Sequence, residues 1–263
     1  MQPEFKLKCF IGTRDSDWTD PGYHQHETVE ISLLMDGRGI FQWEEKREPL
    51  EPGHVVLIPA GLPHWFEGIG YNRYGVIHLQ HMPRRLQDML NELVGENRPT
   101  LFLLSPLDKE RYIRLFREWL RTMSAPLKKR AWHNTAWIEV LVLFLLEHSQ
   151  TDREALSISK AGDWIRENLQ HKVQMSELAE LAGMTESGFR RLFEQVYHMS
   201  PKQYQQQCRM AEAKWQLSSA DKGMLDIAES IGFSRQHSFS LWFKQLEGVS
   251  PTEWRKQQQQ HFR

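Results

Sequence analysis

Two histidines and a glutamate near the N-terminal end have the side-chain types and the spacing to bind a metal ion or a polar ligand. His24 and His26 alternate with Gln25, and Glu30 follows four residues after His26. Residues an even number of positions apart share one face of a strand, so both imidazoles and the carboxylate would point the same way. His64 lies on a second stretch that can return to the same end of a β domain. Three imidazoles and one carboxylate suit a divalent transition metal such as non-haem iron, manganese, nickel or zinc.

The same four residues support two other interpretations. They could be the polar lining of a pocket for an organic ligand, or histidines satisfied by hydrogen bonds inside the fold. Such pockets are mostly apolar with a few fixed polar groups, so nearby aromatic residues are candidates for the pocket wall, or else ordinary core. The residues expected to bind this ligand are His24, His26, Glu30, Trp43, His64 and His78, with Tyr23, Trp65 and Phe66 as further aromatic candidates.

A sequence repeat toward the C-terminal end is the second feature that points to function. Leu178-Ala179, Gly183, Met184 and Thr185 return 49 residues later as Ile227-Ala228, Gly232, Phe233 and Ser234. Phe193, Ser200-Pro201 and Tyr204 return 50 residues later as Phe243, Ser250-Pro251 and Trp254. Each copy predicts a short helix ended by a C-cap glycine, a turn, and a second helix that begins at a Thr or Ser N-cap. The Ser-Pro pair then starts the next helix.

The second helix of each copy is predicted to be amphipathic, with apolar residues at i, i+3, i+4 and i+7. The two stripes are Phe189, Leu192, Phe193 and Val196 in the first copy, and Phe239, Trp242, Phe243 and Leu246 in the second. The outer face of the first copy bears Ser187, Arg190 and Arg191. This is the pattern of a helix-turn-helix, whose second helix enters the DNA major groove, where arginine can bridge O6 and N7 of guanine. Helical repeats that bind only protein are the alternative.

The elements that must position these residues fall into three stretches. Residues 1 to about 82 are predicted to be strands of an all-β barrel or sandwich, because short apolar runs are punctuated by Gly and Pro. The expected strands are 29–35, ended by Asp36-Gly37, then 40–43, 54–58 and 74–80. Two helices are expected at 108–123 and about 132–147, the second apolar nearly all round. The polar, uncapped segment 151–154 is the expected linker, and 201–218 is expected to be one helical spacer roughly 27 Å long.

Composition excludes several classes of protein. The chain has 263 residues, 40% hydrophobic and 25% charged, which is typical of globular proteins. The two cysteines, Cys9 and Cys208, lie far apart and imply neither a disulfide framework nor a zinc knuckle, so a reducing cytoplasm is expected. The first residues lack the pattern of a secretory signal, and the most apolar stretch, 137–146, is too short to span a membrane. The net charge of −1 indicates no partner by itself, and no nucleophile with its base or glycine-rich phosphate loop is present.

Residues 157 to 257 resemble the DNA-binding region of the AraC/XylS family of bacterial transcription regulators. The motifs are LAELAGMTESGFRRLF at 178–193 and IAESIGFSRQHSFSLWF at 227–243, each followed by Ser-Pro and an aromatic residue. The resemblance implies DNA contacts by Glu186, Ser187, Arg190 and Arg191 in the first motif, and by Arg235, Gln236, His237 and Ser240 in the second. Leu241 departs from the family's pattern, because this outer-face position of the second motif, which matches Arg191 in the first, is usually basic. The second helix is therefore expected to read DNA through a thymine methyl group or DNA shape, or to contribute mostly backbone affinity.

The N-terminal part resembles the cupins through HxHxxxExxxxxxG at 24–37 and GxxxxxPxGxxH at 53–64. Gly68 stands where the second cupin motif has Asn, and no glycine precedes the first motif at the usual distance. The resemblance implies a multidomain fold: an all-β cupin-like barrel, linker helices, and an all-α domain with two helix-turn-helix motifs. The expected domains are 1–106 for effector binding, 107–150 for the linker and dimerisation helices, and 157–263 for DNA binding.

The leading hypothesis is a cytoplasmic transcription regulator, not an enzyme, in which a small effector bound by the barrel controls DNA binding. Its expected partners are double-stranded DNA, the small-molecule effector, RNA polymerase and a second copy of the chain, with no membrane. The only cofactor that the sequence suggests is a divalent transition metal in the barrel. The competing hypotheses are a metal-dependent cupin enzyme, such as a dioxygenase or isomerase, with a helical appendage, and a helical module that binds only protein.

Overall fold

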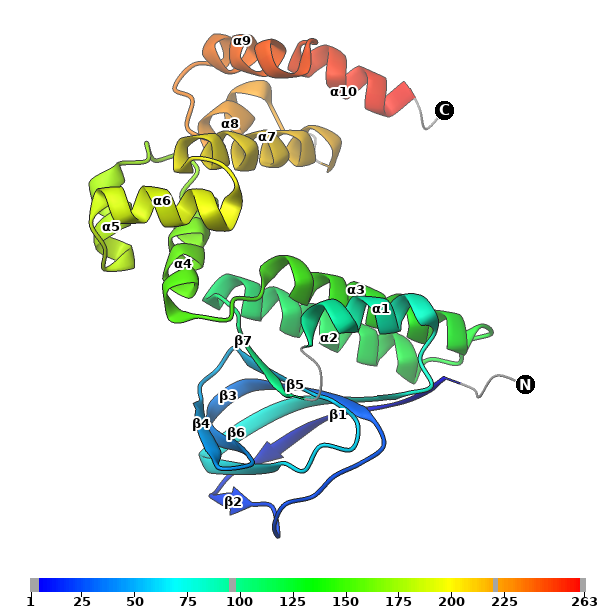
Figure 1. Cartoon of the computed structure of the whole chain (residues 1–263). Coiled ribbons are helices and arrows are strands. Elements are labelled where there is room, and N and C mark those ends of the chain that lie inside the picture. The colour runs from blue at the N-terminus through cyan, green and yellow to red at the C-terminus, as the bar shows by residue number, and fades with distance from the viewer. Residues whose placement is uncertain (1–4, 95–97, 220–221, 261–263) are drawn as a thin grey trace. The chain divides into compact units, whose positions relative to one another are not determined.

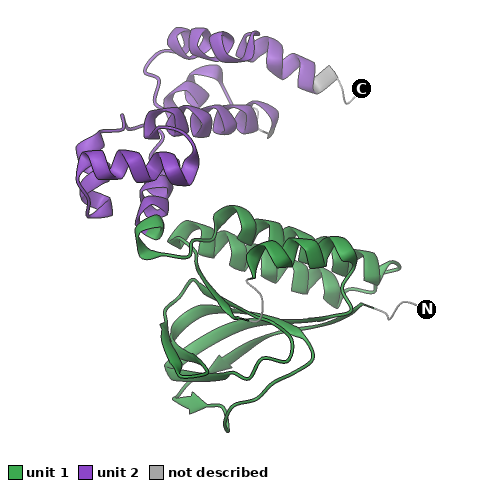
Figure 2. Ribbon diagram, in the orientation of Figure 1, with its two compact units in different colours: residues 1–156 green, residues 157–263 purple. Residues whose placement is uncertain are grey.

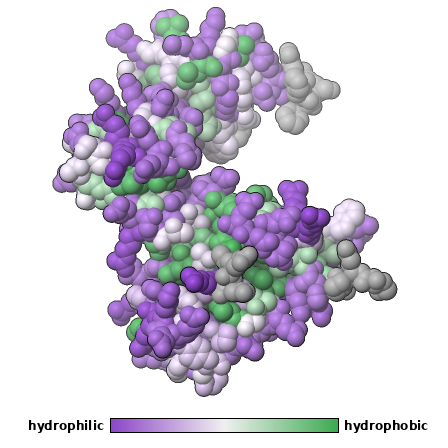
Figure 3. All heavy atoms as spheres, in the orientation of Figure 1, coloured by the Kyte–Doolittle hydropathy of each residue, from purple (hydrophilic) through white to green (hydrophobic). Residues whose placement is uncertain are grey.

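The computed structural model describes residues 5–94, 98–219 and 222–260 (Figure 1). The chain divides into two compact units, Met1–Leu156 and Ser157–Arg263 (Figure 2). In the first unit an antiparallel β-sheet is covered by helices, and the second unit is helical. Hydrophilic side chains cover most of the face that Figure 3 shows, and hydrophobic side chains gather in patches between them. None of the described helices is long and apolar enough to cross a bilayer.

Two long strands organise the sheet of the first unit. The strands are β1 (Lys6–Arg14), β2 (Trp18–Thr19), β3 (Val29–Trp43), β4 (Lys46–Leu50), β5 (His54–Ile58), β6 (Trp65–Gln80) and β7 (Thr100–Leu103). Their order is β1-β6-β3-β5-β7, with β2 paired to β6 and β4 paired to β3. β3 and β6 pair from Val29 opposite Leu79 to Gln42 opposite Trp65. Residues distant in the sequence are therefore brought together mainly across this pair.

The structure corrects the expected strand boundary at Asp36-Gly37. Residues 29–43 form one strand of 15 residues, not two strands separated by a turn. The β3–β6 register shifts between Leu34 and Asp36 and again between Gly37 and Arg38, so the turn-forming residues lie in a β-bulge. Gly37 has a φ of 85°, and a Cβ there would overlap the backbone of Tyr71. Glycine is thus required for the bulge rather than for a chain reversal.

The sheet buries a separate apolar cluster on each face. Ile31, Leu33 and Met35 of β3 pack in the cluster that includes the helices, whereas Leu34 and Phe41 pack in the other cluster. This alternation is what a strand buried on both faces requires. Residues 30 and 32 share the face of Leu34, and both are polar: Glu30 and Ser32. A polar group is thereby placed inside an otherwise apolar domain.

Three helices cover one face of the sheet: α1 (Arg84–Leu93), α2 (Pro106–Ser124) and α3 (Arg130–His148) (Figure 1). α2 and α3 correspond to the two helices expected from the apolar periodicity. α1 was not predicted, because no helix or strand was expected between residues 82 and 108. Its buried residues, Leu86, Met89, Leu90 and Leu93, follow the same i, i+3, i+4, i+7 spacing as the helices that were predicted.

Seven of the described helices lie wholly or mostly in the second unit, and the first of them begins just before its boundary. They are α4 (Arg153–Glu167), α5 (Met175–Ala182), α6 (Glu186–Tyr197), α7 (Pro201–Ser219), α8 (Met224–Ser230), α9 (Gln236–Glu247) and α10 (Pro251–Gln260). The prediction that 151–154 is uncapped is wrong, because α4 begins inside this segment and continues across the boundary between the two units. Asp152 Oδ1 accepts a hydrogen bond of 2.6 Å from the backbone N–H of Ala155 and so caps the first turn.

The helix ends of the first copy follow the predicted pattern, whereas the second copy departs from it twice: the C-cap of α8 is Ile231 rather than Gly232, and the start of α9 also differs. Gly183 ends α5 in the left-handed conformation, and Thr185 Oγ1 accepts a hydrogen bond from Gly188 N at the start of α6. α9 instead begins after Arg235, without a side-chain cap, so the prediction that Ser234 caps it is wrong. Ser234 lies 49 residues after its counterpart Thr185, whereas Phe239 lies 50 residues after its counterpart Phe189. The one additional residue therefore shifts the start of α9 beyond Ser234.

The spacer helix α7 belongs to the apolar cores of both copies. Tyr204 packs with Phe189 and Phe193 in the first core, and Met210, Ala213 and Leu217 pack with Phe239 and Phe243 in the second. Leu246, expected to continue the apolar stripe of α9, is instead 56% exposed. Trp254 of α10 packs against Phe243, with 6.2 Å between ring centroids, so this end of the core is closed by another helix.

Candidate functional site

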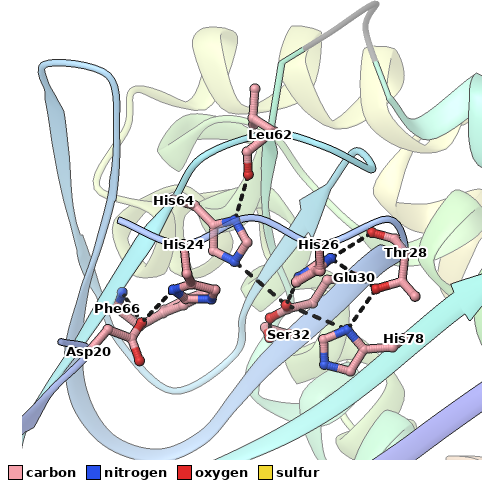
Figure 4. Close-up of polar contacts among 10 residues, drawn as sticks. All are labelled: Asp20, His24, His26, Thr28, Glu30, Ser32, Leu62, His64, Phe66 and His78. Atoms are coloured by element: carbon pink, nitrogen blue, oxygen red, sulfur yellow. Dashed lines mark hydrogen bonds and ion pairs between the residues drawn. The ribbon is translucent and has the colours of Figure 1, made fainter. Parts of the chain in front are cut away.

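Two long-range pairings assemble a cluster of four histidines and one glutamate, called here the histidine cluster: His24, His26, Glu30, His64 and His78 (Figure 4). Glu30 of β3 lies opposite His78 of β6 in the register of the sheet. His24 and His64 form an isolated β-bridge through two backbone hydrogen bonds of 3.0 and 2.9 Å. His24 and His26 precede β3, so the expected placement of all three side chains on one strand is wrong, but the side chains still converge.

The Glu30 carboxylate lies at the centre of the histidine cluster and is only 5% exposed. Its Oε2 atom is 2.8 Å from His26 Nε2, 3.7 Å from His64 Nε2 and 3.8 Å from His78 Nδ1. The hydroxyl of Ser32 donates a hydrogen bond of 2.5 Å to Oε1. The carboxylate is therefore surrounded by groups that donate to it or carry positive charge when protonated.

These contacts set the protonation of the cluster. Burial alone would raise the pKa of Glu30, but the contacts with His26, His64 and Ser32 outweigh burial and hold this pKa well below its usual value. The contact with Glu30 raises the pKa of His26. Burial lowers the pKa of His78, against the opposing effect of Glu30. The buried carboxylate is thus ionised, with neutral or protonated imidazoles around it.

The orientation of the imidazoles fits a metal ion. His26 Nδ1 and His64 Nδ1 each lie 2.8 Å from a backbone carbonyl oxygen, of Thr28 and Leu62 respectively. Each carbonyl fixes its ring so that Nε2 is directed toward Glu30, which is how metal-binding histidines are commonly held. His64 is fully buried, and its Nε2 has no hydrogen-bond partner among the described residues. Ligand atoms lie within 4.8 Å of one another in two overlapping sets, His24/His26/His64 and His26/Glu30/His78. The cluster could therefore hold a metal ion.

A cavity of about 210 Å³ adjoins the histidine cluster. Its polar lining includes Asp20, His24, Glu30, Ser32, Asn72, Tyr74 and His78, and its apolar wall includes Phe10, Trp18, Phe66 and Val76. Tyr74 Oη is buried and has no hydrogen-bond partner in the described part of the chain. Asn72 is fully buried and accepts a hydrogen bond of 2.7 Å from Trp18 Nε1. The cavity therefore combines fixed polar groups with aromatic walls.

Of the residues expected to bind the effector, His24, Glu30 and His78 line the cavity, whereas His26, His64 and Trp43 do not. Trp43 is not among the residues that line the cavity: its ring stacks on Phe41, with 5.2 Å between centroids, and Lys46 Nζ lies 5.3 Å from its centroid. Sequence reasoning missed Trp18, Asp20, Ser32, Asn72 and Tyr74, which reach the cavity through strand pairing. Of these residues, only Ser32 could have been predicted from the local sequence. It lies two residues after Glu30, so the two side chains share one face of the strand.

The expected DNA-contact residues lie on the outer faces of α6 and α9. Glu186, Ser187, Arg190 and Arg191 are exposed and, with Glu194, line a shallow depression on α6. Arg235, Gln236 and His237 are exposed, and Ser240 is half-buried. Glu194 and Lys244, three residues after Arg191 and Leu241, are also exposed on these faces and were not among the predicted contacts. Helical periodicity could have indicated both.

Comparison with known proteins identifies both units. Residues 9–145 match the model of the AraC-like ligand binding domain, and residues 178–257 match a helix-turn-helix domain. The chain is 28% identical over 255 residues to LumQ, a probable transcriptional regulator of Photobacterium leiognathi, with 95% of this chain and 98% of LumQ covered. It is 25% identical over 269 residues to the melibiose operon regulatory protein of Escherichia coli K12, with 91% and 85% covered. It is 22% identical over 241 residues to the transcriptional activator RhaR of Mannheimia succiniciproducens, with 88% and 86% covered.

The matches settle the choice between a regulator and an enzyme. The three relatives are transcription regulators, and none is an enzyme. The ligand-binding domain model includes the histidine cluster and the cavity, and the helix-turn-helix model includes α6 and α9. The chain belongs to the AraC family of DNA-binding transcription regulators, with an AraC-like ligand-binding domain followed by a helix-turn-helix domain.

Proposed function

We propose that a small effector binds in the cavity beside the histidine cluster and changes the affinity of the regulator for DNA. The observation that carries this proposal is the buried set of polar groups around a cavity of about 210 Å³. A cavity of this volume suits a small molecule. Regulation requires the effector to bind one arrangement of the protein better than another, since a ligand with equal affinity for both shifts nothing.

A thermal-shift screen of small polar metabolites tests effector binding. A ligand at a hundred times its Kd stabilises by about 2.7 kcal/mol, which raises Tm by roughly 5–10 °C in a domain of this size. Gly12→Leu places a side chain on the cavity-lining face of β1 and should abolish the shift, whereas Thr13→Leu, on the opposite face, should retain it. A compound that binds wild type but leaves its affinity for DNA unchanged would contradict regulation through this cavity.

We propose that the outer faces of α6 and α9 contact DNA through Glu186, Ser187, Arg190, Arg191, Arg235, Gln236, His237 and Ser240. Support comes from the exposed side chains on two amphipathic helices, with Phe189 and Phe239 fully buried behind them. The double variant Arg190→Ala/Arg191→Ala should lose about 1–3 kcal/mol per bidentate base contact. The dependence of affinity on salt should also weaken.

A fluorescence-anisotropy titration with duplex DNA measures this loss. The control is Arg114→Ala/Arg121→Ala, which removes the same charge from exposed positions on α2 of the first unit. It should bind DNA nearly as wild type does. Equal losses in both double variants would show that net charge, not the α6 contact, determines affinity.

We also propose that the histidine cluster binds a divalent transition metal through His24, His26, Glu30 and His64. Support comes from the converging ligand atoms and from the two backbone carbonyls that orient His26 and His64. Elemental analysis of protein purified without chelator should find close to one equivalent of metal. Less than about a tenth of an equivalent, together with no change in Tm when zinc, manganese, nickel or iron is added, would contradict a metal site.

We infer that α3 joins two copies of the chain. Trp132, Val140 and Leu143 are exposed, and their spacing of eight and three residues places them along one side of the helix. Val140→Glu/Leu143→Glu should shift the sedimentation coefficient from that of a dimer to that of a monomer. A wild-type protein that sediments as a monomer at micromolar concentration would contradict the inference.

A further inference from the structure

An exposed leucine occupies the outer face of α9. Leu241 is 57% exposed, whereas Phe239 and Phe243 on the opposite side of the helix are fully buried. His237, four residues before Leu241, and Lys244, three residues after it, are both exposed. Because residues three or four apart are neighbours on a helix, Leu241 lies between an imidazole and an ammonium group. The outer face of α9 therefore presents an exposed apolar side chain flanked by two polar ones.

The repeat shows which residue of the first copy corresponds to this leucine. α6 and α9 both have 12 residues, and their first residues, Glu186 and Gln236, are 50 positions apart. Leu241 therefore occupies the same place on its helix as Arg191, and Lys244 the same place as Glu194. The two helices present the same geometry with different chemistry. At this position the first copy offers five N–H donors and the second offers only methyl groups.

The base edges of DNA restrict what a leucine can recognise. In the major groove every base presents donors or acceptors, and thymine alone adds a methyl group. A leucine that packs against a donor or acceptor excludes water from that group and makes no hydrogen bond in return, which is unfavourable. Against the thymine methyl it buries apolar surface on both sides. An arginine at the same place prefers O6 and N7 of guanine.

We propose that Leu241 makes the second helix-turn-helix specific for thymine at the base position that the first copy, through Arg191, reads as guanine. This inference rests on the proposed contact of α6 and α9 with DNA and names the base chemistry of each half of the site. The two halves of the binding site are consequently different in sequence, although the two motifs are copies of one another.

Deoxyuridine, which is thymidine without the methyl group, provides the direct test. Wild-type protein is first used to select duplexes from a pool of random sequence. The selected duplex is then synthesised with each thymidine replaced in turn by deoxyuridine, and its affinity is measured by anisotropy. One replacement in the second half-site should weaken wild-type binding about fourfold, because one buried methyl group contributes about that much. Leu241→Ala should bind the two duplexes equally at this position.

Leu246→Ala is the matched control. Leu246 lies on the same helix and is exposed to nearly the same extent, 56%, but it follows the apolar stripe on the side away from Leu241. This variant should retain the fourfold preference for thymidine. Leu241→Arg should select guanine where wild type selects thymine, since it restores the residue of the first copy. Far-UV circular dichroism of each variant checks that α9 remains folded.

The possible outcomes separate this inference from the proposed DNA contact. If wild type selects a consensus but no deoxyuridine replacement changes its affinity by more than about twofold, Leu241 does not read a methyl group, and the DNA contact stands. The same conclusion follows if Leu241→Ala retains the full preference for thymidine. If wild type enriches no sequence at all, both the specific contact and the thymine inference are overturned.

Discussion

Replacing Glu30 with glutamine tests whether its ionised carboxylate holds the histidine cluster together. The side chain is 5% exposed and receives close contacts from His26, at 2.8 Å, and Ser32, at 2.5 Å. A hydrogen bond to a charged group contributes about 1.5–3 kcal/mol, against about 0.5–1.5 kcal/mol for a neutral pair. Glutamine retains the shape but not the charge. Two weakened bonds therefore lower the free energy of unfolding by about 2–3 kcal/mol.

The direction of this effect follows from the protonation of Glu30. The pKa of Glu30 lies below its usual value, so its surroundings favour the charged form even after the cost of burial. The stabilisation is present above the pKa of an unfolded glutamate, about 4.3, and is lost as the pH falls through the lower pKa of the folded state. The difference between wild type and Glu30→Gln should accordingly shrink below about pH 4.5. It should also decrease as the pH rises through the raised pKa of His26, because the stabilisation from protonated His26 is fully present only below the pKa of an unfolded histidine, about 6.5.

Thermal unfolding of chelator-treated protein at pH 7.5 measures the loss. A decrease of about 2–3 kcal/mol corresponds to a fall in Tm of roughly 5–10 °C for a domain of this size. Glu67→Gln is the control: Glu67 pairs with the exposed Arg47 at 2.9 Å, and surface pairs contribute about 0–1 kcal/mol. A Glu30→Gln variant that melts within 1 °C of wild type would refute the reasoning. Added metal should then raise the Tm of wild type more than that of Glu30→Gln.

Three further substitutions probe the elements that position the two sites. Gly39→Ala would place a Cβ over Tyr74 Oη and 2.7 Å from the backbone oxygen of Glu67. It should lower the free energy of unfolding, measured in urea, by about 1–3 kcal/mol. Gly12→Ala is the control: its Cβ meets no atom closer than 3.8 Å, so the variant should be neutral or slightly stabilising. Thr185→Ala removes the cap of α6 and should cost about 1 kcal/mol, while Ser234→Ala should change stability by less than about 0.5 kcal/mol; equal losses would contradict the different starts of α6 and α9. Asn72→Ala leaves Trp18 Nε1 without its acceptor and should cost about 1–3 kcal/mol, a loss that should shrink when Trp18 is also replaced by Phe.

Local patterns in the sequence predicted the helices well. The buried residues of α2, Tyr112, Phe116 and Trp119, follow the helical period, and the capping residues Gly183 and Thr185 act as expected. Such signals are local, because a helix satisfies its hydrogen bonds within a few residues. The same spacing at Leu86 and Leu90 is a local signal for α1.

The pairing of the strands and the lining of the cavity could not be predicted from local sequence patterns, because both depend on the register between distant strands. Asp36-Gly37 has the composition of a turn, but pairing with β6 carries β3 straight through it. The place of His78 beside Glu30 follows from the register of two strands nearly fifty residues apart, and a shift by one residue would send the side chain to the other face. The spacing of His24, His26 and Glu30 indicated that they act together, but the partners around them became visible only with the register.

The members of the histidine cluster differ in how firmly main-chain hydrogen bonds hold them. This difference predicts how fast their amide protons exchange with solvent. Glu30 and His78 belong to the longest ladder of the sheet, whereas His24 and His64 are held to each other by two main-chain hydrogen bonds outside any regular strand. Separating that bridge leaves the ladder intact, so its opening is a local fluctuation rather than global unfolding. The amide protons of His24 and His64 should therefore exchange with deuterium sooner than those of Glu30 and His78.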